Sequence, residues 1–255
     1  LVTVPAKHYG ADLTGMLEAG TANTRLIFIA NPNNPTGTRV GASELLPFLQ
    51  AVPEHGWVVL DEAYLEYVED ADHLNGATVL AQFPNLIVTR TFSKIYGLAA
   101  VRFGYSVSSP AFADLLNRAR QPFNVNSLAM AAVMAALEDD DYVAQSIALN
   151  RAGMKQMTEG LTTLGYDFIP SAGNFVAFDC GESGSDLFQR MLREGVIVRA
   201  IAEYGLPNHV RVSIGLAAEN ERFLAVLAKV GAKAGAKVDA KAAASGVGDK
   251  GAPRS

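Results

Sequence analysis

Short apolar runs, each bounded by turn residues, recur through the first hundred residues of the chain. The runs are continuous rather than alternating, which is typical of strands buried on both faces of a sheet. They cover Leu26–Ala30, Trp57–Leu60 and Leu86–Thr89, and Ser43 can cap a helix over Glu44–Val52. Strand, helix and strand at this spacing predict right-handed crossovers and a mostly parallel sheet.

A second pattern begins at Ser127 with a helical stretch rich in Ala, Met and Leu, which we expect to continue past an acidic break toward Leu164. A smaller α/β unit follows it. Its expected elements are strands Asn174–Phe178, Val196–Val198 and Val210–Ile214, a helix capped by Ser185 that runs through Arg193, and a helix over Ala218–Val230. The chain is therefore predicted to be an α/β protein with a large domain over residues 1–130 and a connecting helix plus small domain over 131–230.

The two ends of the chain differ from the rest. Residues 231–255 are mostly Ala, Gly and Lys and cannot build a core, so we expect a disordered tail, with binding to an acidic partner as the alternative. Leu1–Val4 has the pattern of a strand already under way, and no methionine precedes it. We therefore expect the natural protein to continue upstream of Leu1.

Composition narrows the class of protein. A net charge of -5 argues against a nucleic-acid surface, which needs clustered Lys and Arg. The longest apolar run, Leu128–Leu137, is about half the ~20 residues that a spanning helix needs, so no membrane segment is expected. The single cysteine fits a reducing compartment, and we expect a cytoplasmic protein. The four histidines show no metal-ligand spacing, so no metal site is predicted.

Polar motifs follow the predicted strands in a fixed order. Asn31-Pro-Asn-Asn-Pro-Thr-Gly37 comes first, then Asp61-Glu-Ala-Tyr64, then Thr91-Phe-Ser-Lys-Ile-Tyr-Gly97 with Arg102, and last Arg199 and Arg211. Ligands of open α/β sheets bind beyond the carboxyl ends of the strands. Each motif alone has an ordinary structural reading, as a turn, a solvated strand end or a surface cation. Their occurrence together predicts a site at that edge of the sheet.

These motifs resemble those of the fold-type I pyridoxal-phosphate enzymes of the class I/II aminotransferase group, and most closely those of histidinol-phosphate aminotransferases. Also shared are Pro122-Phe-Asn-Val-Asn126, Gly195-Val-Ile-Val-Arg199 and Leu206-Pro-Asn-His-Val-Arg-Val-Ser-Ile-Gly215, and the match spans residues 1 to about 230. The resemblance implies pyridoxal 5'-phosphate as the cofactor. It also implies the fold-type I transferase fold, with an incomplete large domain and a smaller C-terminal domain.

The resemblance assigns the reacting groups. Lys94 would bind the cofactor covalently and then move a proton at the substrate Cα, since an amine freed of its proton can do both. Asp61 would keep the pyridine nitrogen protonated, which makes the ring an electron sink. Tyr64 and Asn34 would hydrogen-bond the phenolic oxygen of the ring. For Asn34, turn formation before a proline is a reasonable alternative.

The resemblance also implies two sets of anion contacts. Thr91, Ser93 and Arg102 would bind the cofactor phosphate, with two hydroxyls and one fixed cation. Alternation along the strand independently turns Arg211 away from Val210 and Val212, and the resemblance makes it the residue that binds the substrate α-carboxylate. The resemblance implies that Arg199 binds the substrate phosphate and that Asn174 lies near the substrate. We expect Arg199 to end the strand over Val196–Val198.

The implied reaction transfers an amino group from histidinol phosphate to 2-oxoglutarate, in histidine biosynthesis, by a homodimer. Three alternatives remain: an aromatic amino acid aminotransferase, a threonine-phosphate decarboxylase, and a cofactor-binding fragment without turnover. The fragment is considered because family members carry about a hundred residues before the point matching Leu1. Those residues supply cofactor contacts and a tyrosine lent across the dimer interface. Leu216 and Ala217 depart from the threonine and glutamate of many relatives.

Overall fold

We describe residues 1–232 of the chain in a computed structural model. They divide into two compact units: Leu1–Ala152 with Ile169–Phe175, and Gly153–Phe168 with the residues from Val176 onward. The predicted domain boundary near residue 130 stays a prediction, because compactness alone does not define a domain. The tail predicted to be disordered lies almost wholly outside the described residues. No helix among residues 1–232 is both long and apolar enough to cross a membrane.

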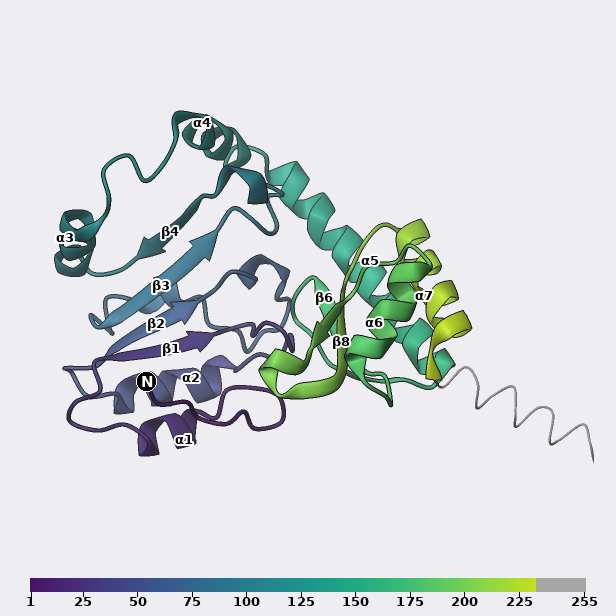
Figure 1. Cartoon of the computed structure of the whole chain (residues 1–255). Coiled ribbons are helices and arrows are strands. Elements are labelled where there is room, and N and C mark those ends of the chain that lie inside the picture. Colours follow the sequence, from purple (N-terminus) through teal and green to yellow (C-terminus); the bar gives the residue numbers. More distant parts are fainter. Residues whose placement is uncertain (233–255) are drawn as a thin grey trace, which may run out of the picture. The chain divides into compact units, whose positions relative to one another are not determined.

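The first unit is built on a four-stranded sheet (Figure 1). Its strands lie in chain order: β1 (Leu26–Ala30), β2 (Trp57–Asp61), β3 (Leu86–Thr91) and β4 (Gly104–Val107). The first three are parallel and β4 is antiparallel to β3. The sequence prediction of a mostly parallel sheet is confirmed, and the three apolar runs are its parallel strands.

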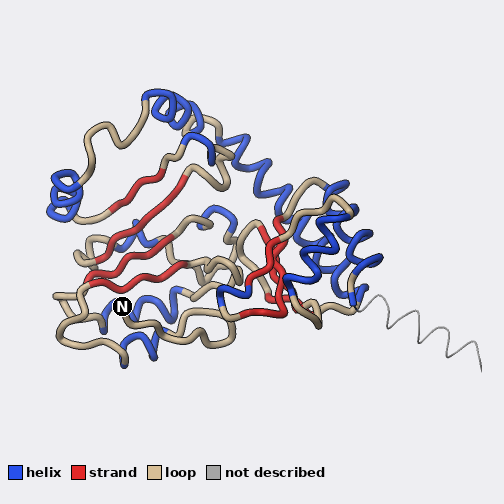
Figure 2. Tube along the Cα trace, viewed as in Figure 1, coloured by secondary structure: helices blue, strands red, loops and turns tan. Residues whose placement is uncertain are grey.

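Helices α1 (Leu13–Glu18) and α2 (Ala42–Ala51) run along one side of this sheet (Figure 2). The core between them and the sheet contains Leu45, Leu60 and Leu86, none of which is exposed. On the other face of β1, however, Leu26 and Phe28 are 51% and 65% exposed. The expectation that this strand is buried on both faces is therefore wrong, because among the described residues only one of its faces is covered.

The remaining elements of the first unit follow the sheet. They are α3 (Pro110–Ala119), α4 (Ser127–Ala136), the part of α5 (Asp140–Leu164) up to Ala152, and the short 3-10 helices η1 (Leu65–Tyr67), η2 (Gly76–Val79) and η3 (Ala99–Val101). The predicted helical stretch from Ser127 to Leu164 is confirmed, with a break between α4 and α5.

The second unit has its own sheet, in the order β5-β6-β8-β7. The elements are β5 (Asp167–Ile169), β6 (Phe175–Asp179), α6 (Gly184–Arg193), β7 (Arg199–Ile201), η4 (Ala202–Tyr204), β8 (Leu206–Ser213) and α7 (Ala217–Val230). Its core joins the sheet to three helices through fully buried side chains such as Met157, Phe178, Leu187, Met191 and Leu227.

Two helix caps differ from the expected ones. Helix α2 begins after Gly41, and Ser43 instead donates its hydroxyl and its backbone N–H to Asp72, at 2.7 and 3.0 Å. Helix α6 is capped by Ser183, whose hydroxyl accepts from Asp186 N at 3.3 Å, rather than by Ser185. Sequence showed a capping residue near each start, but the residue used depends on where the chain enters the helix.

Two expected strands are absent among the described residues. Leu1–Val4 forms no strand. Residues 196–198 form none either, because the chain is still closing helix α6 there: Val196 N donates to Met191 O at 3.0 Å, and Gly195 has a φ of 78°. The strand begins at Arg199 instead, so Arg199 starts its strand rather than ending it.

Candidate active site

Three segments that carry the sequence motifs meet at one edge of the first sheet. The Asn31–Gly37 turn follows β1, Asp61 ends β2, and Lys94 follows shortly after β3. The strands are in register, with Asp61 beside Thr89, and Asn31 N donates to Asp61 O at 2.9 Å. The expectation that the motifs gather at the carboxyl ends of parallel strands is confirmed.

Lys94, Tyr64 and Asn34 form the centre of this edge. Tyr64 is buried, and its hydroxyl accepts from Asn34 Nδ2 at 3.4 Å. Lys94 Nζ lies 5.1 Å from the centre of the Tyr64 ring, within the range of a cation–π contact. Phe175 packs edge-on against the same ring, with centroids 5.2 Å apart. The amine of Lys94 and the amide of Asn34 thus both contact the buried phenol of Tyr64.

The turn that carries Asn34 is fixed from its other end. Gly37 has a φ of 79°, and a Cβ added there would collide with the side chain of Ser171. Its carbonyl accepts from Ala172 N at 2.8 Å. Only glycine fits this position, because any side chain would block the close approach to Ser171. The hydrogen bond from Ala172 then holds the turn against the segment that leads to Asn174.

Asn174 lies one residue before Phe175, and its side chain hydrogen-bonds Tyr67. Tyr67 is the last residue of η1, the short helix that begins directly after Tyr64. Burial, helped by the neighbouring Glu66 carboxylate, raises the pKa of Tyr67 to about 12, and the bond from Asn174 partly opposes this shift. Tyr67 is therefore a neutral hydroxyl at neutral pH, able to donate as well as accept.

Two hydroxyls and a cation cluster next to Lys94. Thr91 Oγ1 accepts from Ser93 N at 3.0 Å, and Ser93 Oγ accepts from Arg102 Nη1 at 3.4 Å. Arg102 adopts a left-handed backbone conformation with a φ of 56°, and its Nη1 also donates to Ala99 O at 2.9 Å. The structure thus brings together the three residues that the sequence suggested as anion ligands.

Asp61 presents its carboxylate at the exposed end of β2. One oxygen, Oδ1, accepts from Ala63 N at 3.0 Å, which fixes the side chain in a turn. A carboxylate with free accepting capacity at this edge can hold a protonated ring nitrogen.

Arg199 and Arg211 lie in the second unit. Val210 and Val212 are buried while Arg211 is partly exposed, so the predicted alternation along β8 is confirmed. Strands β7 and β8 are antiparallel, with Arg199 directly opposite Arg211. Arg199 Nη2 also donates to Glu203 Oε1 at 2.6 Å.

Comparison with known proteins places this geometry in a family. The model of the family "Aminotransferase class I and II" matches residues 1–227. The chain belongs to the class I and II aminotransferases.

Two similar curated proteins carry the same name. The chain is 62% identical over 227 residues to histidinol-phosphate aminotransferase 2 of Pseudomonas fluorescens (strain Pf-5), covering 89% of this chain and 61% of that protein. It is 56% identical to histidinol-phosphate aminotransferase 2 of Pseudomonas aeruginosa, covering 89% and 62%. The chain thus spans about three fifths of the length of these curated relatives.

A solved structure shows the same fold. The histidinol-phosphate aminotransferase from Sinorhizobium meliloti, in complex with pyridoxal-5'-phosphate, is 36% identical and superposes with a TM-score of 0.83, over 90% of this chain and 63% of that one. The predicted fold class, α/β of the fold-type I pyridoxal-phosphate transferases, is confirmed.

One buried ion pair was missed by sequence reasoning. Glu62 is 1% exposed, and its Oε2 accepts from Arg90 Nε and Nη2 at 3.0 and 2.7 Å. Its Oε1 accepts from Gly76 N at 2.7 Å, and Arg90 Nη2 also reaches Asn75 Oδ1 at 2.6 Å. Burial raises the pKa of Glu62 although these donors oppose the shift.

This pair joins the two strand ends that carry the site. Glu62 directly follows Asp61, and Arg90 directly precedes Thr91. Period-two alternation could have revealed it, because Glu62 falls on the same face as the buried Val58 and Leu60.

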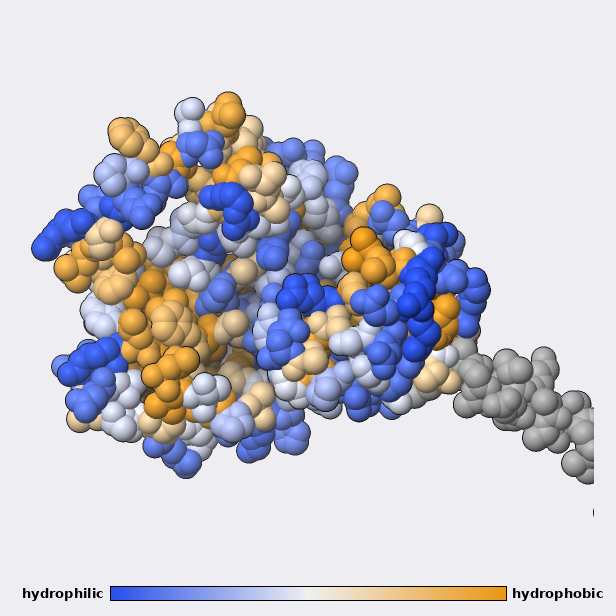
Figure 3. All heavy atoms as spheres, in the orientation of Figure 1, coloured by the Kyte–Doolittle hydropathy of each residue, from blue (hydrophilic) through white to orange (hydrophobic). Residues whose placement is uncertain are grey.

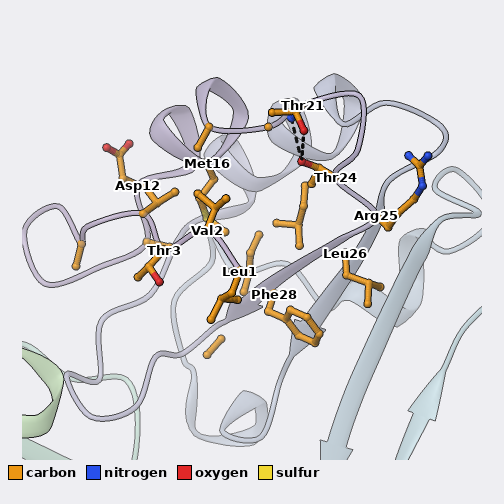
Figure 4. Close-up of a pocket in the computed structure, with 18 of the residues that line it drawn as sticks. Leu1, Val2, Thr3, Asp12, Met16, Thr21, Thr24, Arg25, Leu26 and Phe28 are labelled. Carbon is orange, nitrogen blue, oxygen red and sulfur yellow. Dashed lines mark hydrogen bonds between the residues drawn. The ribbon is translucent and has the colours of Figure 1, made fainter.

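A hollow of about 750 Å³ lies beside β1, away from the site (Figure 4). It is lined by residues 1–4, α1 and β1, and Leu1, Leu26 and Phe28 are among its walls. None of the site residues predicted from sequence lines it. Its lining mixes apolar residues with polar ones such as Asp12 and Arg25, and does not include Lys94, Asp61 or Tyr64.

Proposed function

We propose that the protein is a pyridoxal-phosphate-dependent aminotransferase that converts histidinol phosphate and 2-oxoglutarate to imidazole-acetol phosphate and glutamate, in histidine biosynthesis. The observation that carries the proposal is the cluster of Lys94, Tyr64 and Asn34 beside Ser93 and Arg102. The identities of 55% and more to proteins named histidinol-phosphate aminotransferase support the choice of substrate.

The donor set fits the cofactor. Pyridoxal phosphate offers an aldehyde, a phenolic oxygen, a ring nitrogen and a phosphate, and supplies an electron-withdrawing ring when bound. Lys94 would hold the aldehyde carbon, and Asp61 would hold the proton on the ring nitrogen. Tyr64 and Asn34 would bind the phenolic oxygen. Thr91, Ser93 and Arg102 would bind the phosphate.

The chain's own residues then have separable tasks. Lys94, once displaced by substrate, would take the proton from the substrate carbon that bears the amine and deliver it to the carbon on the other side of the amine nitrogen. Arg211 would hold the α-carboxylate of glutamate, and Arg199 the phosphate of histidinol phosphate. Asn174, fixed by Tyr67, would lie against the substrate.

The proposal includes a cytoplasmic homodimer, as the family resemblance implies. Its test is an amino-acceptor screen on the complete natural protein, with imidazole-acetol phosphate and phenylpyruvate side by side. A strong preference for imidazole-acetol phosphate supports the proposal. A preference for phenylpyruvate replaces it with an aromatic amino acid aminotransferase, and turnover of neither with the cofactor bound leaves a binding protein.

A further inference from the structure

Two positive charges face each other on one strand pair of the second unit. Arg199 and Arg211 are direct partners across β7 and β8. Side chains at directly opposed positions share one face of an antiparallel pair, with Cβ atoms about 5 Å apart, and like charges there destabilise the pair. Arg211 is flanked by the buried Val210 and Val212, so its strand cannot turn it away without losing core packing.

A carboxylate from the connection between the same strands reaches this pair. Glu203 lies in η4, where the chain turns back through Gly205 at a φ of 78°. Its Oε1 accepts from Arg199 Nη2 at 2.6 Å. This bond lowers the pKa of Glu203, and the more distant charge of Arg211 lowers it further. Glu203 is thus ionised at neutral pH and is the carboxylate partner of Arg199, opposite Arg211.

The Glu203 contact is accessible. The side chains of Arg199 and Glu203 are 57% and 51% exposed. Exposed ion pairs contribute little to stability, because solvent screens the two charges. A dianion arriving from solvent can therefore take the place of this carboxylate on Arg199.

We infer that Glu203 is a tethered competitor for the substrate anion: it neutralises Arg199 opposite Arg211 when the site is empty and is displaced when a phosphate or carboxylate binds. The inference rests on the proposed function, in which both arginines bind substrate anions. It makes Glu203 an affinity-determining residue, since an anion that binds Nη2 of Arg199 must displace it.

Two opposite effects follow from one substitution. In Glu203→Gln the carboxylate partner of Arg199 is lost, so the charge of Arg199 beside Arg211 is no longer neutralised by Glu203, and the melting temperature without anion should fall. Inorganic phosphate should then bind about two- to fivefold tighter, because it no longer has to break the exposed Arg199–Glu203 pair. Phosphate should raise the melting temperature of this variant more than that of the wild type.

The experiment measures phosphate binding by calorimetry and thermal unfolding in protein loaded with pyridoxal phosphate, so that the cofactor's own phosphate occupies its ligands. Glu221→Gln is the matched control, because it removes the same charge from an exposed position on α7. Arg199→Ala and the double variant Arg199→Ala/Glu203→Gln complete a cycle. The effect of Glu203 on phosphate affinity should vanish when Arg199 is absent.

The outcomes separate the two proposals. If Arg199→Ala weakens phosphate binding but Glu203→Gln binds no tighter than Glu221→Gln, the inference is overturned and the role of Arg199 stands. If Arg199→Ala leaves phosphate binding unchanged, both the role of Arg199 as a phosphate ligand and the inference fail. The inference is also overturned if phosphate binds neither the wild type nor Glu203→Gln. It is overturned as well if Glu203→Gln still changes phosphate affinity when Arg199 is absent.

Discussion

At the scale of single residues, the site depends on a few side chains whose neighbours are known. Lys94 Nζ lies over the Tyr64 ring, and Lys94 directly follows Ser93, whose hydroxyl accepts from Arg102. Asp61 is anchored by a backbone N–H of its own turn. Each has a counterpart elsewhere in the chain with the same chemistry and no place in the site, which allows matched tests.

We expect Lys94→Ala to abolish covalent attachment of pyridoxal phosphate, because among residues 1–232 it is Lys94 that lies beside the Tyr64 ring and the hydroxyl cluster. The measurement is borohydride reduction followed by peptide mass mapping, with the exposed Lys155→Ala as the control. Finding the cofactor mass on a different lysine of the wild type would refute the assignment.

Asp61→Asn should leave attachment intact but slow the half-reaction with glutamate by about a thousandfold, or ~4 kcal/mol in barrier. The amide cannot hold the ring nitrogen in its protonated form, so the ring withdraws electrons poorly. Stopped-flow absorbance measures the rate. Asp179→Asn is the control, because Asp179 also ends a strand and also accepts from a turn N–H, that of Gly181 at 2.8 Å. Equal rates in the two variants would disprove the role of Asp61.

At the scale of elements, the ends of β2 and β3 are tied together beneath the site. The Glu62–Arg90 pair is held by four donor–acceptor contacts, and Asn75 and Gly76 bring the start of η2 into the same network. A buried carboxylate without its cation is costly, because neither water nor another charge replaces the lost partner.

Arg90→Ala should therefore lower the free energy of unfolding by about 3 to 5 kcal/mol, the usual scale for removing one partner of a buried pair. Urea unfolding measures this change. Arg151→Ala is the control, since Arg151 pairs with Glu69 at the surface, where solvent screening leaves a far smaller effect. If the two variants are destabilised equally, the buried pair is not what holds the strand ends.

At the scale of the whole molecule, apolar side chains lie exposed on the first unit. Figure 3 shows hydrophobic residues gathered on the face of that unit. Leu26 and Phe28 are exposed on β1, a strand whose pairing among the described residues is with β2 alone. A strand edge with exposed apolar side chains is a template for association with other chains.

Phe28→Lys should slow aggregation of this chain on heating several-fold, because a charge on the edge strand opposes pairing with another copy. Light scattering at a fixed temperature below the melting point measures the rate. Leu149→Lys, at an exposed apolar position on α5, is the control for added charge alone. Similar slowing in both variants would show that net charge, and not the β1 edge, governs association.

The sequence by itself determined the parallel strands and the motifs at their ends. Continuous apolar runs bounded by turn residues define β1, β2 and β3, and parallel strands must bring their carboxyl ends to one edge. Alternation along β8 likewise turned Arg211 away from the core. Such features are local, because in a strand or helix the position of a residue along the chain determines the face on which its side chain lies.

Only the tertiary structure decided which distant residues meet. Glu62 and Arg90 belong to different strands, Asp72 holds the start of α2 from a remote loop, and Arg199 faces Arg211 only because β7 and β8 pair in that register. The exposed face of β1 was also beyond prediction, since an apolar run does not say which of its faces the fold covers. These contacts depend on how segments far apart in sequence pack, and no local pattern carries that information.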